Sequence, residues 1–96
     1  MPKFQAIIRF NMTETFMSRI PEHRQYVNRL ISNGSIDHYV VSMESQRVWI
    51  TLNAEDKNEV TRLLEGSPLH TWWEYEVEEL FVFDGQQYRM PELNPN

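Results

Sequence analysis

The stretch 63–80, LLEGSPLHTWWEYEVEEL, decides the fold of this chain. It predicts the end of a helix, a break at Gly66-Ser67-Pro68, and then a strand in which acidic and apolar residues alternate. Side chains of a strand point alternately to its two faces. One face then carries Glu74, Glu76 and Glu78, and the other carries Trp73, Tyr75 and Val77. The second of these faces suits a core, whereas the carboxylates need solvent, cations or a partner chain.

Two helical segments precede this strand. Helical spacing begins at Thr13, and Pro21 marks a kink or the first turn of a new segment, which stops at Asn33-Gly34. A second helix, predicted to be capped by Asn53, ends at Gly66. Alternation of apolar and polar residues predicts strands over 3–10, 36–43, 47–53 and 71–83. The order β-α-β-β-α-β predicts an α+β, ferredoxin-like antiparallel sheet with two helices on one face.

The face without helices, called the open face below, is predicted to pair with a second copy of the chain. It carries Gln5, Ile7, Arg9, Trp49, Thr51, Glu74, Glu76 and Glu78. Pairing two such faces into a barrel-like homodimer buries the aromatic side chains and leaves a small polar interior. Residues 1–83 form the predicted domain, and 84–96 form a C-terminal arm. The Asp84-Gly85 pair predicts a hairpin in this arm, which ends in a frayed tail.

Composition excludes several classes of function. The 96 residues carry a net charge of −5, and the nine basic residues are scattered along the chain, which argues against nucleic-acid binding. The chain has no cysteine, so thiolate catalysis and disulfides are excluded. No apolar run reaches the roughly 18–20 residues of a membrane span. The N-terminal stretch reads as a first strand and lacks a signal-peptide pattern, so a cytoplasmic protein is expected.

A family resemblance covers residues 24–80. The residues that carry it are Tyr26, Leu30, Gly34, His38, Leu63-Leu64, Pro68-Leu69, Glu76-Val77-Glu78 and Leu80. In these positions the chain resembles the muconolactone isomerase-like family of dimeric α+β barrel proteins. The resemblance implies a cofactor-free isomerase that moves a double bond in a small lactone, often as a ring of dimers. Such chemistry needs a base and a group that stabilises the enolate.

The resemblance also implies three catalytic residues, namely Glu22, Arg24 and His38. Arg24 stands where it implies a lysine; an arginine stabilises an oxyanion but does not release its proton. His38 is the best candidate base because histidine titrates nearest neutral pH, and its alternative is a strand histidine satisfied by hydrogen bonds. Strict alternation places Asp37 on the opposite face from His38. Arg9 is expected to face Glu74 or Glu76 across the sheet.

A pocket for a small planar or anionic molecule is the expected binding site. Its predicted lining residues are Arg9, Arg24, Tyr26, His38, Trp49 and Trp72. Trp72-Trp73 is expected to place one ring in the core and the other on the open face. The three histidines lack the short spacings of metal sites, so no metal is expected. Two alternatives stay open: a non-catalytic homodimeric binding or assembly module, and a cofactor-free monooxygenase of the same fold.

Overall fold

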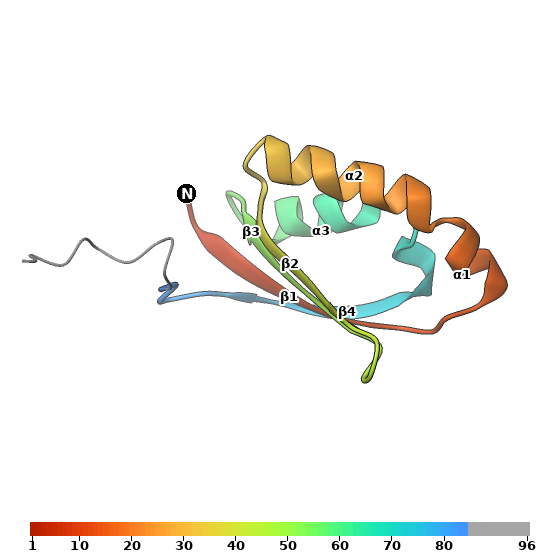
Figure 1. Ribbon diagram of the computed structural model, residues 1–96. Coiled ribbons are helices and arrows are strands. Elements are labelled where there is room, and N and C mark those ends of the chain that lie inside the picture. The colour runs from red at the N-terminus through yellow and green to blue at the C-terminus, as the bar shows by residue number, and fades with distance from the viewer. Residues whose placement is uncertain (85–96) are drawn as a thin grey trace, which may run out of the picture.

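Four antiparallel strands form one sheet in the order β2-β3-β1-β4 in the computed structural model, which describes residues 1–84 (Figure 1). The strands are β1 (Lys3–Phe10), β2 (Ile36–Ser42), β3 (Arg47–Asn53) and β4 (Trp73–Glu79). The helices are α1 (Glu14–Ser18), α2 (Ile20–Ser32) and α3 (Lys57–Glu65), and a short 3-10 turn, η1 (His70–Trp72), precedes β4. This arrangement confirms the predicted ferredoxin-like α+β fold.

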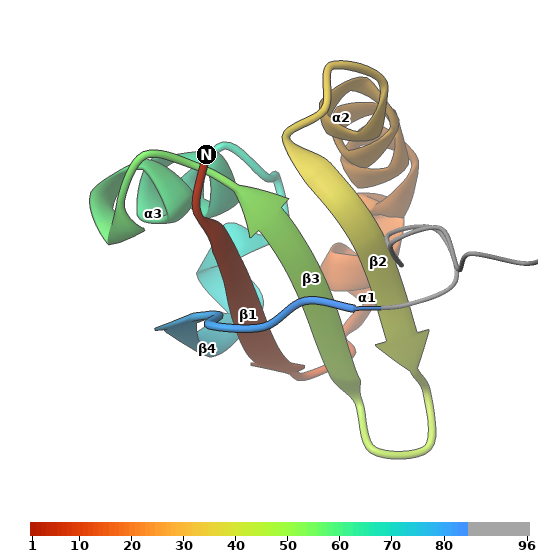
Figure 2. The same ribbon diagram turned by 90° about the vertical axis from the view of Figure 1, so that its left-hand side faces the viewer.

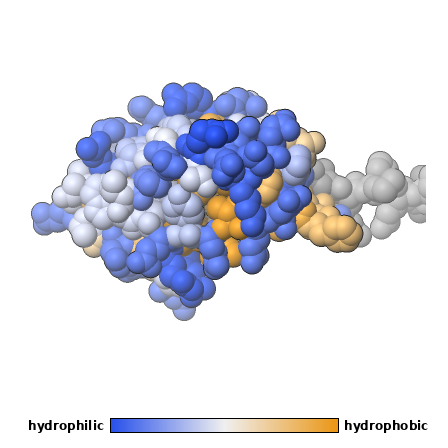
Figure 3. All heavy atoms as spheres, turned by 180° about the vertical axis from the view of Figure 1, so that it is seen from behind, coloured by the Kyte–Doolittle hydropathy of each residue, from blue (hydrophilic) through white to orange (hydrophobic). Residues whose placement is uncertain are grey.

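The core lies between the sheet and the helices α2 and α3, which cover the same face (Figure 1). Alternation along each strand decides which side chains enter it. The inward set from the strands is Phe4, Ala6, Ile8, Phe10, Ile36, Val48, Ile50 and Leu52. The apolar stripes of the helices add Val27, Leu30, Val60 and Leu64. Hydrophilic residues cover most of the surface seen from behind, with a limited area of hydrophobic residues between them (Figure 3).

The helix boundaries follow local capping chemistry. The Thr13 hydroxyl accepts a hydrogen bond from the Phe16 N–H at 3.0 Å and so begins α1. Pro21 lies in the first turn of α2, where its missing N–H costs nothing, and this confirms the predicted break. The prediction of Asn53 as the cap of α3 was wrong. Asp56 caps that helix by accepting from the Glu59 N–H at 2.9 Å.

Two glycines are required by their surroundings. Gly34 follows α2 with φ of +85°, a conformation that side chains with a Cβ rarely adopt. Gly66 follows α3, and a Cβ at this position would collide with the phenol oxygen of Tyr26. That phenol donates a hydrogen bond to the Leu63 carbonyl at 2.6 Å. Tyr26 of α2 thereby ties the two helices together at the end of α3.

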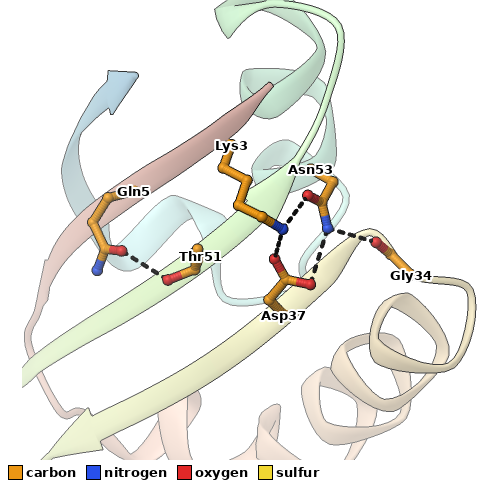
Figure 4. A network of polar contacts seen from close by, with 6 residues as sticks. All are labelled: Lys3, Gln5, Gly34, Asp37, Thr51 and Asn53. Carbon is orange, nitrogen blue, oxygen red and sulfur yellow. Dashed lines mark hydrogen bonds and ion pairs between the residues drawn. The ribbon is translucent and has the colours of Figure 1, made fainter. Parts of the chain in front are cut away.

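A β-bulge interrupts β2 at Asp37. Ile36 pairs with Leu52, and His38 pairs with the neighbouring Thr51. Two residues along β2 therefore correspond to one residue along β3. The extra residue turns the Asp37 side chain to the open face, where it contacts Lys3 at 2.5 Å and accepts from the Asn53 amide at 3.0 Å (Figure 4). The expectation that Asp37 and His38 point to opposite faces is therefore corrected.

The segment after β4 crosses the open face. The strand ends at Glu79 rather than at residue 83, because β1, its pairing partner, begins at Lys3; the Leu80 N–H donates to the Lys3 carbonyl at 2.8 Å. Residues 80–84 then run across β1 and β3 toward β2 (Figure 2). The Phe83 ring lies 5.1 Å from the Lys3 ammonium and 5.7 Å from the His38 ring. The hairpin expected at Asp84-Gly85 and the rest of the arm lie outside the described residues.

Candidate functional site

An apolar cavity of about 190 Å³ lies between the sheet and the helices α1 and α2. Its walls come from β1, α1, α2, β2, β3 and the chain entering β4, and they include Phe10, Phe16, Ile20, Val48, Leu69 and Trp73. Exposed apolar side chains, Met12, Met17, Val41 and Met43, line its mouth. In another protein an apolar cavity of about 150 Å³ binds benzene. This cavity is therefore large enough for a molecule of about one ring.

Three polar side chains line the same cavity, and His23 is the most buried of them, with 2% of its surface exposed. Its Nδ1 lies 2.7 Å from the Ser67 hydroxyl, and its Nε2 lies 2.6 Å from the Tyr39 hydroxyl. The ring also stands edge-on to Trp73 at 5.5 Å. The hydrogen-bond chain Ser67-His23-Tyr39 thus links the turn after α3, helix α2 and strand β2.

Burial keeps the His23 imidazole and the Tyr39 phenol uncharged. Desolvation, with a smaller contribution from the Arg24 cation, lowers the pKa of His23 from 6.5 to about 4. Desolvation raises the pKa of the Tyr39 phenol to about 12, although the Arg24 cation acts in the opposite direction. At neutral pH the cavity therefore holds an uncharged imidazole and an intact phenol O–H.

Arg24 supplies the positive charge of the site. It lines the cavity, and its guanidinium lies 5.7 Å from the centre of the Tyr39 ring. The side chain is exposed, so its charge stays in contact with solvent at the edge of an otherwise apolar cavity. A phenol donor and a cation beside apolar walls suit a ligand with a flat body and an oxygen of partial or full negative charge.

The structure does not bring the predicted lining residues into one pocket. Arg24 lines the cavity, whereas His38 and Trp49 lie on the open face, separated from Arg24 by the sheet. Tyr26 packs between α2 and α3. Glu22 is exposed and forms an ion pair with Arg19 at 3.4 Å.

Arg9 and Trp72 meet at a different place, a polar hollow of about 330 Å³ at one end of the sheet. Arg9 lies opposite Glu74 in the register of β1 and β4, as expected. Of the pair Trp72-Trp73, Trp73 lies in the core as expected, and Trp72 lines the hollow beside Arg9 and Glu74. Because η1 precedes the strand, Trp72 is outside the alternation and packs edge-on against Phe16 at 6.1 Å.

The chain Ser67-His23-Tyr39 was missed by the sequence reasoning. His23 does carry a signal, because it shares the apolar stripe of α2 with Val27 and Leu30 at spacings of four and seven residues. Tyr39 is an inward-facing residue of β2, which alternation also indicates. Ser67 carries no signal beyond the turn in which it lies. Its role depends on a contact 44 residues away in the sequence.

Within residues 1–84, no three His, Asp or Glu side chains gather in a group that could hold a metal ion. No helix among the same residues has the length and apolar character needed to cross a membrane.

Comparison with known proteins adds a structural likeness. No family model matches the chain, and no curated protein matches it. A solved structure that is similar is the 5-chloro-2-hydroxyhydroquinone dehydrochlorinase of Burkholderia phenoliruptrix AC1100, in complex with 2,5-dihydroxybenzoquinone. The likeness has a TM-score of 0.59 at 18% sequence identity and covers 78% of this chain and 90% of that chain. At this identity the likeness shows the fold.

Proposed function

We propose that this protein binds a small planar molecule carrying a carbonyl or phenolic oxygen in the cavity between the sheet and α2. We further propose that it promotes cofactor-free proton transfer on that molecule, such as the double-bond shift of a small lactone. The observation that carries the proposal is the Tyr39 hydroxyl, held at 2.6 Å from His23 in an apolar cavity beside Arg24. The quinone bound by the similar dehydrochlorinase, a flat ring with oxygen substituents, is of the same chemical class.

The proposed chemistry follows from the donor and the cation. Solvent water at the exposed mouth of the cavity would take the proton that leaves a carbon beside the carbonyl, negative charge would move to the carbonyl oxygen, and the water would return a proton to another carbon of the conjugated system. Tyr39 would donate its O–H to that oxygen, and Arg24 would stabilise the charge electrostatically. A fixed donor in a water-poor cavity stabilises such a charge more strongly than water does, by about 3–4 kcal/mol for one oxyanion donor in other enzymes.

Proton NMR of muconolactone in heavy water tests the proposal. Wild type is expected to catalyse the entry of deuterium into the ring, and Tyr39→Phe to slow it about 100-fold, because it removes the oxyanion donor and little volume. Tyr75→Phe is the matched control, since Tyr75 lies outside the cavity lining and should leave the rate unchanged. His38→Ala should also leave it unchanged, because His38 lies on the open face. Equal rates for wild type and Tyr39→Phe would overturn the assignment.

A non-catalytic binding module is the second candidate, and one observation favours it. No carboxylate of residues 1–84 lines the cavity, and neither Glu22 nor His38, the bases expected from the sequence, is among its lining residues. A binding module would bind 2,5-dihydroxybenzoquinone, weaken that binding in Tyr39→Phe, and show no deuterium exchange with any lactone. Trp73 in the cavity wall provides the fluorescence signal for this titration.

We also propose that the protein is a homodimer that pairs its open faces. Ile7 and Trp49 are only half-buried there, Val40 is exposed beside Trp49, and Phe81 is fully exposed on the crossing segment. Exposed apolar groups that share one face favour a protein partner. Within residues 1–84, Phe83 contacts the end of the face near Lys3 and His38, and Val40 beside Trp49 stays exposed, so the proposed second copy would cover the end that holds Trp49.

Sedimentation equilibrium tests this pairing. Wild type is expected to give twice the chain mass of 11.6 kDa, and Trp49→Glu to give the monomer mass, because it places a charge where the two faces meet. Asn28→Glu adds the same charge at an exposed position of α2 and is the matched control. A monomeric wild type, or a dimer that Trp49→Glu leaves intact, contradicts the pairing.

A further inference from the structure

The hydrogen bonds of His23 fix which way the neighbouring protons point. Neutral imidazole has one nitrogen that donates and one that accepts. Two arrangements are therefore open to the chain Ser67-His23-Tyr39, whose contacts are 2.7 Å and 2.6 Å. Either Nδ1–H donates to Ser67 and Tyr39 donates to Nε2, or Ser67 donates to Nδ1 and Nε2–H donates to Tyr39.

The hydrogen bonds of Ser67 favour the second of these two proton arrangements. The Ser67 hydroxyl is buried and already accepts a hydrogen bond from the Leu69 N–H at 3.0 Å. The hydroxyl proton still needs an acceptor, and within residues 1–84 the contact found for it is Nδ1 of His23. In the first arrangement Ser67 would accept two N–H groups, and its own proton would be buried without an acceptor, which is unfavourable. The second arrangement gives the proton of the buried Ser67 hydroxyl its acceptor, and it leaves the proton of the partly buried Tyr39 hydroxyl free to turn to the cavity that Tyr39 lines.

We propose that Ser67 is a positioning residue, which holds His23 in the Nε2–H tautomer and thereby turns the Tyr39 proton toward the cavity. The Tyr39 oxygen accepts from Nε2–H, so its own hydrogen is left for a ligand; among the described residues no other acceptor contacts this hydroxyl. The tautomer follows from the protein alone. Its consequence for a ligand rests on the proposed function, in which Tyr39 is the donor.

Long-range proton–nitrogen correlation NMR of the full, nitrogen-15-labelled chain reads the tautomer directly. The His23 signals are assigned by comparison with variants that lack His38 or His70. Wild type is expected to carry its proton on Nε2, and so is Tyr39→Phe, which leaves Ser67 in place. Ser67→Ala should lose this preference, and Ser67→Thr, which keeps the hydroxyl, should restore it. Wild type protonated on Nδ1 overturns the proposal, and that spectrum decides the question even where a Ser67 variant fails to fold.

Titration with 2,5-dihydroxybenzoquinone tests the consequence for a ligand. Ser67→Ala should bind this probe about tenfold more weakly than wild type, as expected for one lost hydrogen bond to a charged oxygen, and Ser67→Thr should recover the affinity. Unchanged affinity in a variant whose tautomer has changed overturns the positioning role. A wild type with Nε2–H that binds no probe supports the tautomer assignment and counts against the proposed function alone.

Discussion

The two faces of this sheet are built from alternating residues of the same strands, yet they treat polar groups in opposite ways. On the helix-covered face the buried His23 and the partly buried Tyr39 are uncharged at neutral pH and hydrogen-bonded to one another. On the open face Lys3 and Asp37 form an ion pair, with 25% and 11% of their side chains exposed. The comparison teaches that cover by the helices moves the pKa values of His23 and Tyr39 toward their neutral forms, whereas the open face leaves its charged groups paired and partly hydrated.

Two adjacent isoleucines test the comparison most strongly. Ile8 is fully buried under the helices, so Ile8→Ala is expected to lower the free energy of unfolding by roughly 2–5 kcal/mol. Ile7 points to the open face and is only half-buried, so Ile7→Ala should cost about 1 kcal/mol in a monomer. Urea unfolding measures both. A cost for Ile7→Ala that grows with protein concentration shows that a second copy covers the open face.

The pH dependence of stability tests the neutral character of the covered face. Because burial lowers the pKa of His23 to about 4, the unfolded chain binds more protons than the folded one between pH 4 and pH 6.5. The contribution of His23 is complete above pH 6.5 and is lost as the pH falls toward 4, by about 3 kcal/mol in all. His23→Gln should remove this slope in urea unfolding followed from pH 7 to pH 4. If His38→Gln on the open face removes the same slope, the assignment to the buried imidazole is wrong.

The sequence predicts the two faces well because they depend on local alternation. The inward set of β1 and β3 and the break at Pro21 need no tertiary information, and the structure has both. The bulge at Asp37 is different, since it depends on Lys3, which is 34 residues away in the sequence. Asn53 looked like a helix cap because its own contacts, with Lys3 and the Gly34 carbonyl, are also distant in sequence.

The candidate site was harder to predict than the fold for the same reason. Its polar chain joins three elements, with sequence separations of 16 and 44 residues between the paired groups. The polar and aromatic residues with the most conspicuous chemistry in the sequence, such as His38 and Trp49, lie across the sheet from the cavity. A histidine on an apolar helical stripe is usually part of a core, so the pattern around His23 does not by itself indicate a site.

A double-mutant cycle on Lys3 and Asp37 tests the charged character of the open face. Lys3→Met and Asp37→Asn remove the charges and keep most of the volume, and their coupling free energy is expected to be about 1 kcal/mol because both groups are partly shielded from water. Arg19 and Glu22 are the control pair, with 49% and 63% of their side chains exposed and a coupling near zero. Equal coupling in the two pairs contradicts the view that the open face shields its ion pair.

Two phenylalanines of the crossing segment provide the smallest and most selective test. Phe83 packs over the Lys3 ammonium and beside the His38 ring, so Phe83→Ala should lower the stability by about 0.5–1 kcal/mol, the size of a partly exposed cation–π contact. Phe81 is fully exposed in the single chain, so Phe81→Ala should leave its stability unchanged. If Phe81→Ala is instead the more damaging of the two in urea unfolding, and only at concentrations where the chain dimerises, the open face is closed by a second copy rather than by the chain's own segment.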